Sequence, residues 1–291
     1  MTIQEAHKNL TKELKGLYDE REAANISHWV MEHLTGLNKL DRIVYKDRLL
    51  EQSQVVQLQN YTASLLTHQP VQYVLHEAWF AGMALYVDEH VLIPRPETEE
   101  LVEWIVLSTK DEVPGTKREL NIIDIGTGSG CIPLALKKYI PQAHIHAIDI
   151  SEGALSVAAR NASVQLLDVD FHQLDILAEN NWNTLGHFDI IVSNPPYIKE
   201  SEASVMHNNV LQHEPHVALF VPDNDPLLFY RKIAEFGKIH LKPGGYLFFE
   251  INEAHGKETA GMLIENGYTQ VEIKIDLQGK ERMIRAIGPS Y

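Results

Sequence analysis

The segment FDIIVSNPPYI, residues 188–198, holds the side chains with the clearest chemical potential in this sequence. An apolar run typical of a buried strand ends at Asn194, and Pro195 and Pro196 follow directly. Proline lacks a backbone N–H and fixes its own φ angle, so the turn is stiff and its carbonyl oxygens remain available as acceptors. The amide oxygen of Asn194 and the carbonyl oxygen of Pro195 would form a rigid pair of acceptors, suited to a planar –NH2 group.

The nitrogen of such a planar group is a poor nucleophile, because its lone pair is delocalised. Two acceptors on its hydrogens would stabilise the positive charge that grows as the nitrogen attacks a methyl carbon. The rest of the catalysis would be in-line positioning, and Tyr197 could pack on the flat substrate group. The alternative is that Asn-Pro-Pro is an ordinary turn that ends a strand.

A glycine-rich loop, DIGTGSG, lies upstream between an apolar run and a helical segment. Alternate glycines allow a tight turn and the close approach of a ligand. Cys131 breaks the dinucleotide spacing, and no lysine follows the loop as in phosphate-binding loops. Asp149 ends the next apolar run, where a carboxylate can accept hydrogen bonds from a ribose diol. Loop and acid together indicate a nucleoside-containing cofactor such as S-adenosylmethionine, unless Asp149 merely caps the next helix.

These motifs lie where strand-like runs alternate with helical segments, which predicts βαβ units and a mostly parallel sheet with helices on both faces. The carboxyl ends of such strands bind ligands, so Asn194 and the glycine loop should meet there. Residues 111–120 are predicted to be a polar loop. The final segments, QVEIKID and ERMIRAIG, predict an antiparallel hairpin. This α/β, Rossmann-like pattern is typical of class I S-adenosylmethionine-dependent methyltransferases. The predicted strands are NIIDIG, HIHAID, VDFHQL, FDIIVSN and GYLFFEI.

The sequence predicts three parts. Residues 1–75 show helical periodicity and form a small N-terminal bundle. Residues 76–95 alternate like a linking hairpin. Residues 96–291 form the methyltransferase domain, and its first helix begins at Pro96 with acidic residues in the first turn.

Composition limits the partners and the compartment. The net charge of −15 falls almost entirely after residue 75, which disfavours binding to nucleic acid phosphates. We see no signal peptide and no run of 18 apolar residues, so no membrane is expected. The single cysteine, Cys131, rules out an intrachain disulfide and fits a reducing cytoplasm. Fifteen histidines show no ligand spacing for a metal, and we expect none.

Beyond these motifs, the chain resembles the release factor glutamine methyltransferases of HemK or PrmC type. The resemblance covers roughly residues 65–288. It rests on NPPY, DIGTGSGCI, the segment QPVQYVLHEAWFAGMALYVDEHVLIPRPETEELVE, HEPHVAL and DLQGKERMI. It implies transfer of a methyl group from S-adenosylmethionine, which leaves S-adenosylhomocysteine, to the glutamine of the Gly-Gly-Gln loop of class I peptide chain release factors. It also implies that the bundle helps to dock that partner.

The resemblance assigns roles to individual positions. Asn194 and Pro195 would be catalytic and, with Pro196 and Tyr197, would hold the glutamine. Asp175 would reach the adenine amino group and Ile176 would cover the ring, although Asp175 alone could be a loop residue. The implied cofactor-binding residues are Arg95, Thr98, Gly126, Thr127, Gly128, Ser129, Gly130, Asp149, Asp175, Ile176 and Asn194, with Pro96 near the methionine end.

Three departures and two alternatives remain. His76 and Asn252 stand where the family often has glycine, and residues 221–226 replace a glycine-rich stretch. We expect none of them to touch the two central motifs, although the change at residues 221–226 could alter a loop near the substrate. NPPY also occurs in adenine-N6 methyltransferases acting on DNA or RNA, which is the first alternative function. The second is a non-catalytic regulator that binds S-adenosylmethionine.

Overall fold

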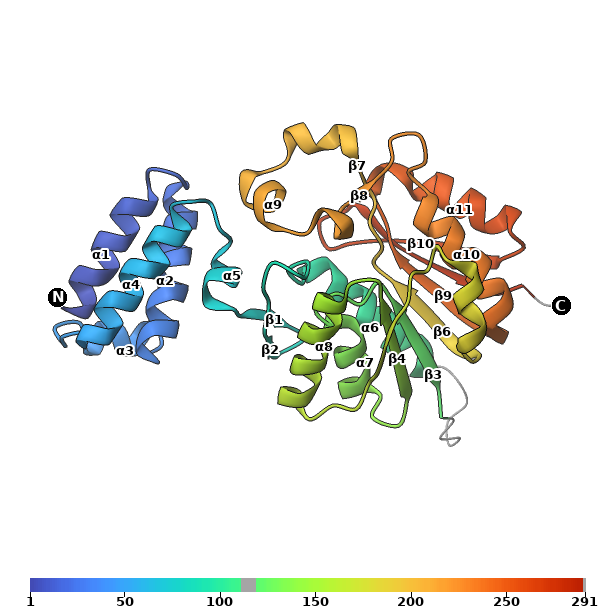
Figure 1. The fold of residues 1–291 in the computed structure, drawn as a ribbon, viewed down its shortest axis with the longest axis horizontal. Helices are drawn as coiled ribbons and strands as arrows, with labels where there is room; N and C mark the ends of the chain where they lie inside the picture. Colours follow the sequence, from blue (N-terminus) through green and yellow to red (C-terminus); the bar gives the residue numbers. More distant parts are fainter. Residues whose placement is uncertain (111–118, 290–291) are drawn as a thin grey trace. The chain divides into compact units, whose positions relative to one another are not determined.

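The computed structural model describes residues 1–110 and 119–289, and it divides into two compact units (Figure 1). Unit 1 comprises Met1–Glu77 and His207–His213, and unit 2 comprises Ala78–Met206 and Glu214–Tyr291. Most of the predicted polar loop, residues 111–118, lies outside the described residues. Within the described ranges, no helix is both long enough and apolar enough to cross a membrane.

Unit 1 is a bundle of short helices with polar caps at their starts. Thr2, Asp19 and Asn38 each accept hydrogen bonds from backbone N–H groups in the first turn of α1, α2 and α3. Apolar residues from α1, α2, α4 and α5 share one core, whereas the apolar side chains of α3 are exposed. The sequence pattern had indicated α1, α2 and α4, but α3 and α5 are too short to show periodicity. The helices are α1 (Ile3–Leu14), α2 (Glu20–Thr35), α3 (Lys39–Val44), α4 (Gln52–Leu65), α5 (Val71–Leu75) and α9 (Asn208–His213).

His76 stands where the resemblance leads us to expect glycine, and its backbone conformation explains why glycine is suited to this position. It ends α5 in the left-handed conformation, with φ of 53° and ψ of 37°. Glycine adopts this helix-end conformation without strain, whereas a histidine there carries a small cost. The position therefore needs a particular backbone conformation, and this chain meets the need without glycine.

Unit 2 is built on a seven-stranded sheet of order β10-β11-β9-β6-β3-β4-β5. The pairs from β9 to β5 are parallel, whereas β11 runs antiparallel to both β9 and β10. This confirms the predicted mostly parallel sheet with a terminal antiparallel hairpin. The strands of this sheet are β3 (Asn121–Ile125), β4 (His144–Asp149), β5 (Asp170–Gln173), β6 (Phe188–Ser193), β9 (Leu241–Glu250), β10 (Thr269–Ile275) and β11 (Glu281–Ile287).

Helices cover both faces of the sheet (Figure 1). Alternate residues of each central strand point to opposite cores: Ile190 and Val192 pack with α6, α7 and α8, whereas Ile191 packs with α10 and α11. The helices are α6 (Pro96–Lys110), α7 (Cys131–Tyr139), α8 (Glu152–Gln165), α10 (Leu228–His240) and α11 (Gly256–Glu265). Two small two-stranded sheets add β1 (Ala78–Phe80) with β2 (Met83–Leu85), and β7 (Ile198–Lys199) with β8 (Phe220–Val221).

The register between β3 and β6 brings the two sequence motifs together. Ser193 lies opposite Ile125, and its hydroxyl donates to the Ile125 carbonyl at 2.6 Å. Asn194 directly follows Ser193 at the end of β6, and Gly126 directly follows Ile125 at the end of β3. The glycine loop and the Asn-Pro-Pro turn are therefore neighbours at the carboxyl edge of the sheet, as the parallel-sheet prediction requires.

Candidate functional site

A cavity of about 240 Å³ opens in unit 2 at the carboxyl ends of the central strands. Most of the residues singled out from the sequence line it. Gly130 and Tyr197 do not belong to its lining, although both belong to the motifs. The predicted residues in the lining are Arg95, Thr98, Gly126, Thr127, Gly128, Ser129, Asp149, Asp175, Ile176, Asn194, Pro195 and Pro196.

The glycine loop has a backbone shape that only glycine adopts freely. Gly126, Gly128 and Gly130 have φ of 76°, 52° and 79°. A Cβ on Gly130 would lie 3.1 Å from the Cβ of Ala158, so this residue permits close packing of the loop on α8. The first two glycines have open space around the missing Cβ, which leaves room for a ligand beside the loop.

Asp149 lies at the end of β4 and is hydrogen-bonded to the glycine loop. Its Oδ2 accepts the N–H of Gly128 at 2.9 Å, and its Oδ1 accepts the N–H of Ser151 at 2.9 Å. Ser151, not Asp149, is the N-cap residue of α8. Burial raises the pKa of the Asp149 carboxyl, while its backbone N–H donors act in the opposite direction. Each oxygen keeps a further lone pair that can face the cavity.

The side of the cavity beyond Asp149 is apolar. Ile176 is buried there, and Asp175 accepts the N–H of Leu177 through Oδ1 at 2.8 Å. Ile150, which is half exposed, and Leu177 also line the cavity. A flat ring could lie between these aliphatic side chains with the Asp175 carboxylate at its edge.

Asp124, directly before the glycine loop, is fully buried at the end of β3. Neither of its oxygens, nor Oγ1 of Thr127, has a hydrogen-bond partner among the described residues. Burial raises the pKa of Asp124 to about 7, the nearby Thr127 hydroxyl acts in the opposite direction, and the charge of Asp149 adds to the rise. Asp124 is not part of the cavity lining, and protonation relieves the cost of burying its carboxylate without a partner.

Asn194 is held by side chains from two other elements. Its Nδ2 donates to Oγ1 of Thr98 at 3.3 Å, and the Thr98 hydroxyl donates to Oε2 of Glu250 at 2.6 Å. In the described part of the chain, Oδ1 of Asn194 accepts no hydrogen bond. Pro195 is buried directly after it. The amide oxygen and the proline carbonyl thus remain available as acceptors at the cavity.

Tyr197 faces away from the cavity lining. Its ring packs against the core beneath α10 and α11, and its hydroxyl donates to Oε1 of Glu250 at 3.2 Å. Burial raises the pKa of the Tyr197 hydroxyl, with the Glu250 carboxylate adding to the effect. Its predicted role of packing on the substrate group therefore finds less support in the geometry than a role in holding the turn.

The expectation that the departures leave the central motifs untouched is wrong for Asn252. Its Nδ2 donates to the backbone carbonyl of Tyr197 at 3.2 Å, and its Oδ1 accepts the N–H of Ala254. The reason is tertiary: β6 and β9 are parallel neighbours, so the residues that follow them meet at the same edge. Residues 221–226, by contrast, do not line the cavity.

A bidentate ion pair borders the cavity. One guanidinium nitrogen of Arg95 donates to both oxygens of Glu214, at 2.7 and 2.8 Å. Burial raises the pKa of Glu214, and Arg95 opposes this shift. The pair joins the segment before α6 to the HEPHVAL loop, whose Val217 and Ala218 line the cavity.

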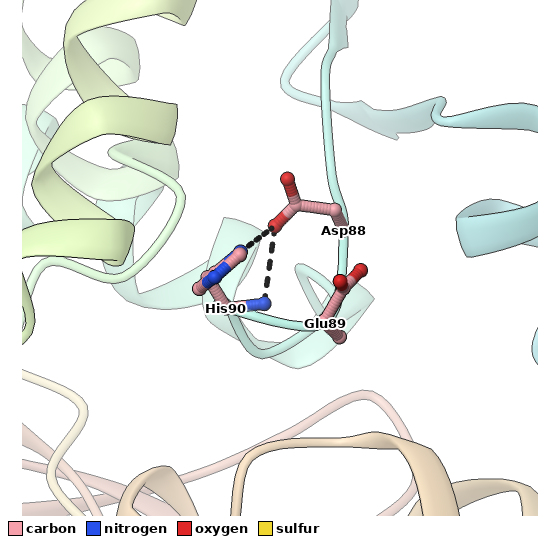
Figure 2. Close-up of side chains that lie close together, drawn as sticks. All are labelled: Asp88, Glu89 and His90. Atoms are coloured by element: carbon pink, nitrogen blue, oxygen red, sulfur yellow. Dashed lines mark hydrogen bonds and ion pairs between the residues drawn. The ribbon is translucent and has the colours of Figure 1, made fainter.

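Two other groups could suggest different chemistry. Figure 2 shows Asp88, Glu89 and His90, whose possible ligand atoms lie within 4.8 Å of one another. Oδ1 of Asp88 already accepts from the backbone N–H of His90 at 3.1 Å and lies 3.0 Å from its ring Nδ1 (Figure 2).

Burial raises the pKa of the Cys131 thiol to about 12, which leaves it a poor nucleophile at neutral pH.

The sequence reasoning missed Ile150, which lines the cavity, and Glu250, which accepts from Thr98 beside it. Ile150 adjoins Asp149, which was singled out, so its place beside a motif was a usable signal. Glu250 ends the fifth predicted strand, and the rule that strand ends bind ligands could have selected it. Glu214 was expected to be structural on a loop that faces the substrate, but the sequence gave no signal that it would pair with Arg95.

Comparisons with known proteins match both the N-terminal and the C-terminal part of the chain to methyltransferases of one family. The family described as "Methyltransferase small domain" matches residues 107–217, and the family described as "PrmC N-terminal domain" matches residues 5–75. The chain is 42% identical over 286 residues to a release factor glutamine methyltransferase of Flavobacterium psychrophilum, covering 98% of this chain and 99% of the relative. It is 41% identical to the release factor glutamine methyltransferase of Bacteroides thetaiotaomicron, covering 95% and 97%.

Solved structures agree on the fold. The crystal structure of a methyltransferase from Pyrococcus furiosus aligns with a TM-score of 0.52, over 80% of this chain and 100% of that one. The two sequences are 19% identical, so the likeness concerns the fold alone.

Proposed function

Because the chain belongs to the family of release factor glutamine methyltransferases, we propose that it transfers a methyl group from S-adenosylmethionine to a glutamine side chain of a class I peptide chain release factor. The observation that carries the proposal is the Asn194 amide oxygen. It receives no hydrogen bond from any described residue, and it lies at a cavity beside the glycine loop, next to the Pro195 carbonyl.

The cavity residues fit S-adenosylmethionine group by group. The open space at Gly126 and Gly128 accommodates a ligand close to the backbone. The spare lone pairs of Asp149, which lines the cavity, suit a ribose diol. Ile150 and Ile176 suit the faces of the adenine ring. When bound, the cofactor supplies an electrophilic methyl group on a positively charged sulfur.

The chain's own residues supply positioning and electrostatics. Oδ1 of Asn194 and the Pro195 carbonyl accept the two hydrogens of the glutamine amide. They keep electron density on its nitrogen and stabilise the charge that develops during attack. No strong base has to act before the transfer, because the nitrogen loses its proton afterwards to water. Pro196 stiffens the turn, so these acceptors are preorganised rather than ordered by the substrate.

The proposal extends to the organisation of the chain. Residues 1–75 would form a docking domain for the release factor, residues 76–95 a linking hairpin, and residues 96–291 the methyltransferase domain. The match of residues 5–75 to the PrmC N-terminal domain supports this division. Since release factors act on cytoplasmic ribosomes, the proposed reaction belongs to the cytoplasm, with no direct role for nucleic acid.

A transfer assay tests the substrate. The protein is incubated with methyl-labelled S-adenosylmethionine and a purified release factor, with the same factor carrying Gln→Ala in its Gly-Gly-Gln loop, or with duplex DNA. Label on the unaltered factor alone is the expected result. Label on DNA alone would support an adenine-N6 enzyme, and label on none despite tight cofactor binding would support a non-catalytic regulator; either result overturns the proposal.

A further inference from the structure

Glu250 lies at the end of β9 and is only 2% exposed. Each of its two oxygens accepts a hydrogen bond from a side chain of another element. Oε2 accepts the hydroxyl of Thr98, in the first turn of α6, at 2.6 Å. Oε1 accepts the hydroxyl of Tyr197, in the turn after β6, at 3.2 Å. The carboxylate therefore holds two groups that flank Asn194.

The bond to Thr98 has a consequence for the orientation of Asn194. A threonine hydroxyl has one hydrogen, and once that hydrogen is donated to a carboxylate, the oxygen can only accept. The group that faces it must be a donor, and the –NH2 end of Asn194 lies 3.3 Å away. An asparagine amide has only two orientations, so fixing its –NH2 toward Thr98 turns its oxygen toward the cavity.

The charges around Glu250 are consistent with an acceptor at this position. Burial raises its pKa, whereas the hydroxyls of Thr98 and Tyr197 and the charge of Arg282 act in the opposite direction. Glu97 is the acidic neighbour that adds to the upward shift. Two hydroxyl donors and a nearby guanidinium offset part of the cost of a buried carboxylate.

We propose that Glu250 is a positioning residue for methyl transfer, acting through Thr98 to fix the amide orientation of Asn194 and through Tyr197 to hold the turn that follows. This inference rests on the proposed function, since it explains how the acceptor pair of that same reaction stays oriented. Glu250 itself is not part of the cavity lining, so it acts through the residues that it contacts.

Loss of the acceptor at position 250 should release the amide. In Glu250→Gln, the side-chain –NH2 can donate to Oγ1 of Thr98, which frees the threonine hydrogen to bond Oδ1 of Asn194. The amide oxygen is then drawn away from the cavity. We expect kcat to fall by about 30-fold or more, because a preorganised acceptor is lost, while the Kd for S-adenosylmethionine changes by less than about threefold.

Substitutions at Thr98 test the relay itself. Thr98→Val removes the hydroxyl at nearly constant shape and should lower kcat to a similar degree. Thr98→Ser retains the hydroxyl and should recover most of the turnover that Thr98→Val loses. The double variant Glu250→Gln/Thr98→Val should be about as slow as either single variant, because both break one chain of hydrogen bonds.

A matched control addresses general damage to the fold. Asp189, near the opposite end of β6, is a buried carboxylate whose Oδ2 accepts from Nζ of Lys242 at 2.7 Å and from the backbone N–H of Asn121 at 2.8 Å. Asp189→Asn should lower thermal stability about as much as Glu250→Gln but leave kcat within about twofold, because its hydrogen bonds to Lys242 and Asn121 do not reach Thr98 or Asn194.

A readout on the ligand-free protein separates this inference from the proposed function. Nuclear Overhauser effects between the Asn194 side-chain –NH2 and the Thr98 methyl group should appear in the unaltered protein and weaken in Glu250→Gln. The Asn194 signals are assigned from Asn194→Ala. If the release factor were not methylated at all, this experiment would still decide the amide orientation.

The outcomes divide cleanly. Loss of turnover with retained cofactor binding, recovery with serine and a displaced amide signal support the positioning role. A Glu250→Gln protein with unchanged kcat and unchanged amide contacts overturns it. Multiplicative losses in the double variant, or equal losses in Thr98→Ser and Thr98→Val, also overturn it, because Thr98 would then act independently of Glu250.

Discussion

The two sides of the cavity are built differently. On the side of the glycine loop, the contacts are made largely by backbone, and the buried carboxylate of Asp124 has no partner among the described residues. On the side of Asn194, the contacts are made by side chains, and the buried carboxylate of Glu250 has both oxygens occupied.

This difference separates binding from orientation. On the first side, the open space at Gly126 and Gly128 and the carboxylate of Asp149 are available to a ligand, whereas Asp124 lies outside the cavity lining. On the second side, both oxygens of Glu250 accept hydrogen bonds, so this carboxylate fixes the orientation of Thr98 and Tyr197. We therefore expect changes on the first side to alter cofactor affinity and pH dependence, and changes on the second to alter turnover.

Asn194→Ala should give the largest effect. Removing one of two preorganised acceptors should lower kcat by about 100- to 1,000-fold. The Kd for S-adenosylmethionine, measured by calorimetry, should change far less, because the loop and Asp149 are intact. A variant that turned over at the normal rate would remove the basis for placing transfer chemistry on this side of the cavity.

Asp124→Asn should change how stability depends on pH in the ligand-free protein. In the unfolded chain Asp124 ionises near 3.8, whereas in the fold it stays protonated up to about pH 7. Folding therefore takes up a proton between these values, and the free energy of unfolding falls as the pH rises through this window.

The asparagine variant cannot take up that proton. Its unfolding free energy, relative to that of the unaltered protein, should rise between pH 4 and pH 7 by an amount on the order of 2–4 kcal/mol. Denaturant unfolding at several pH values measures this difference. Parallel curves for the two proteins would mean that Asp124 is already ionised and paired in the fold.

Asp149→Ala should weaken cofactor binding and largely spare kcat, which is the opposite of the effect expected for Asn194→Ala. Loss of hydrogen bonds from a carboxylate should weaken S-adenosylmethionine by about 10- to 100-fold. At saturating cofactor, kcat should recover to within a few-fold of normal. Thermal unfolding serves as the control, since Asp149 also holds the N–H groups of Gly128 and Ser151. A lower kcat with unaltered affinity would reverse the assignment of the two sides.

Asn252→Gly should give the smallest effect. It removes the hydrogen bond to the Tyr197 carbonyl and the bond from the N–H of Ala254, and it leaves the Glu250 contacts in place. We expect kcat to fall by about two- to fivefold, with cofactor affinity unchanged, because only one of these neutral hydrogen bonds reaches the turn and such a bond contributes modestly. No change in steady-state turnover would indicate that Glu250 alone holds the turn.

The contiguous motifs were the easiest features to predict. The sequence indicated the order of strands and helices around β3 to β6, and it placed Asn194 and Gly126 at one edge because parallel strands share their carboxyl ends. It did not indicate α11. It also placed Tyr197 on the substrate, whereas the structure turns the ring toward the core beneath α10.

The sequence by itself determined the loop, the turn and the acid at the end of β4, because each is a local pattern whose conformation follows from glycine, proline and strand ends. Only the tertiary structure decided how Asn194 is oriented. Thr98, Glu250 and Asn252 lie 96, 53 and 55 residues from the positions they contact in this turn. Contacts over such separations depend on strand register and helix packing, which no local pattern specifies.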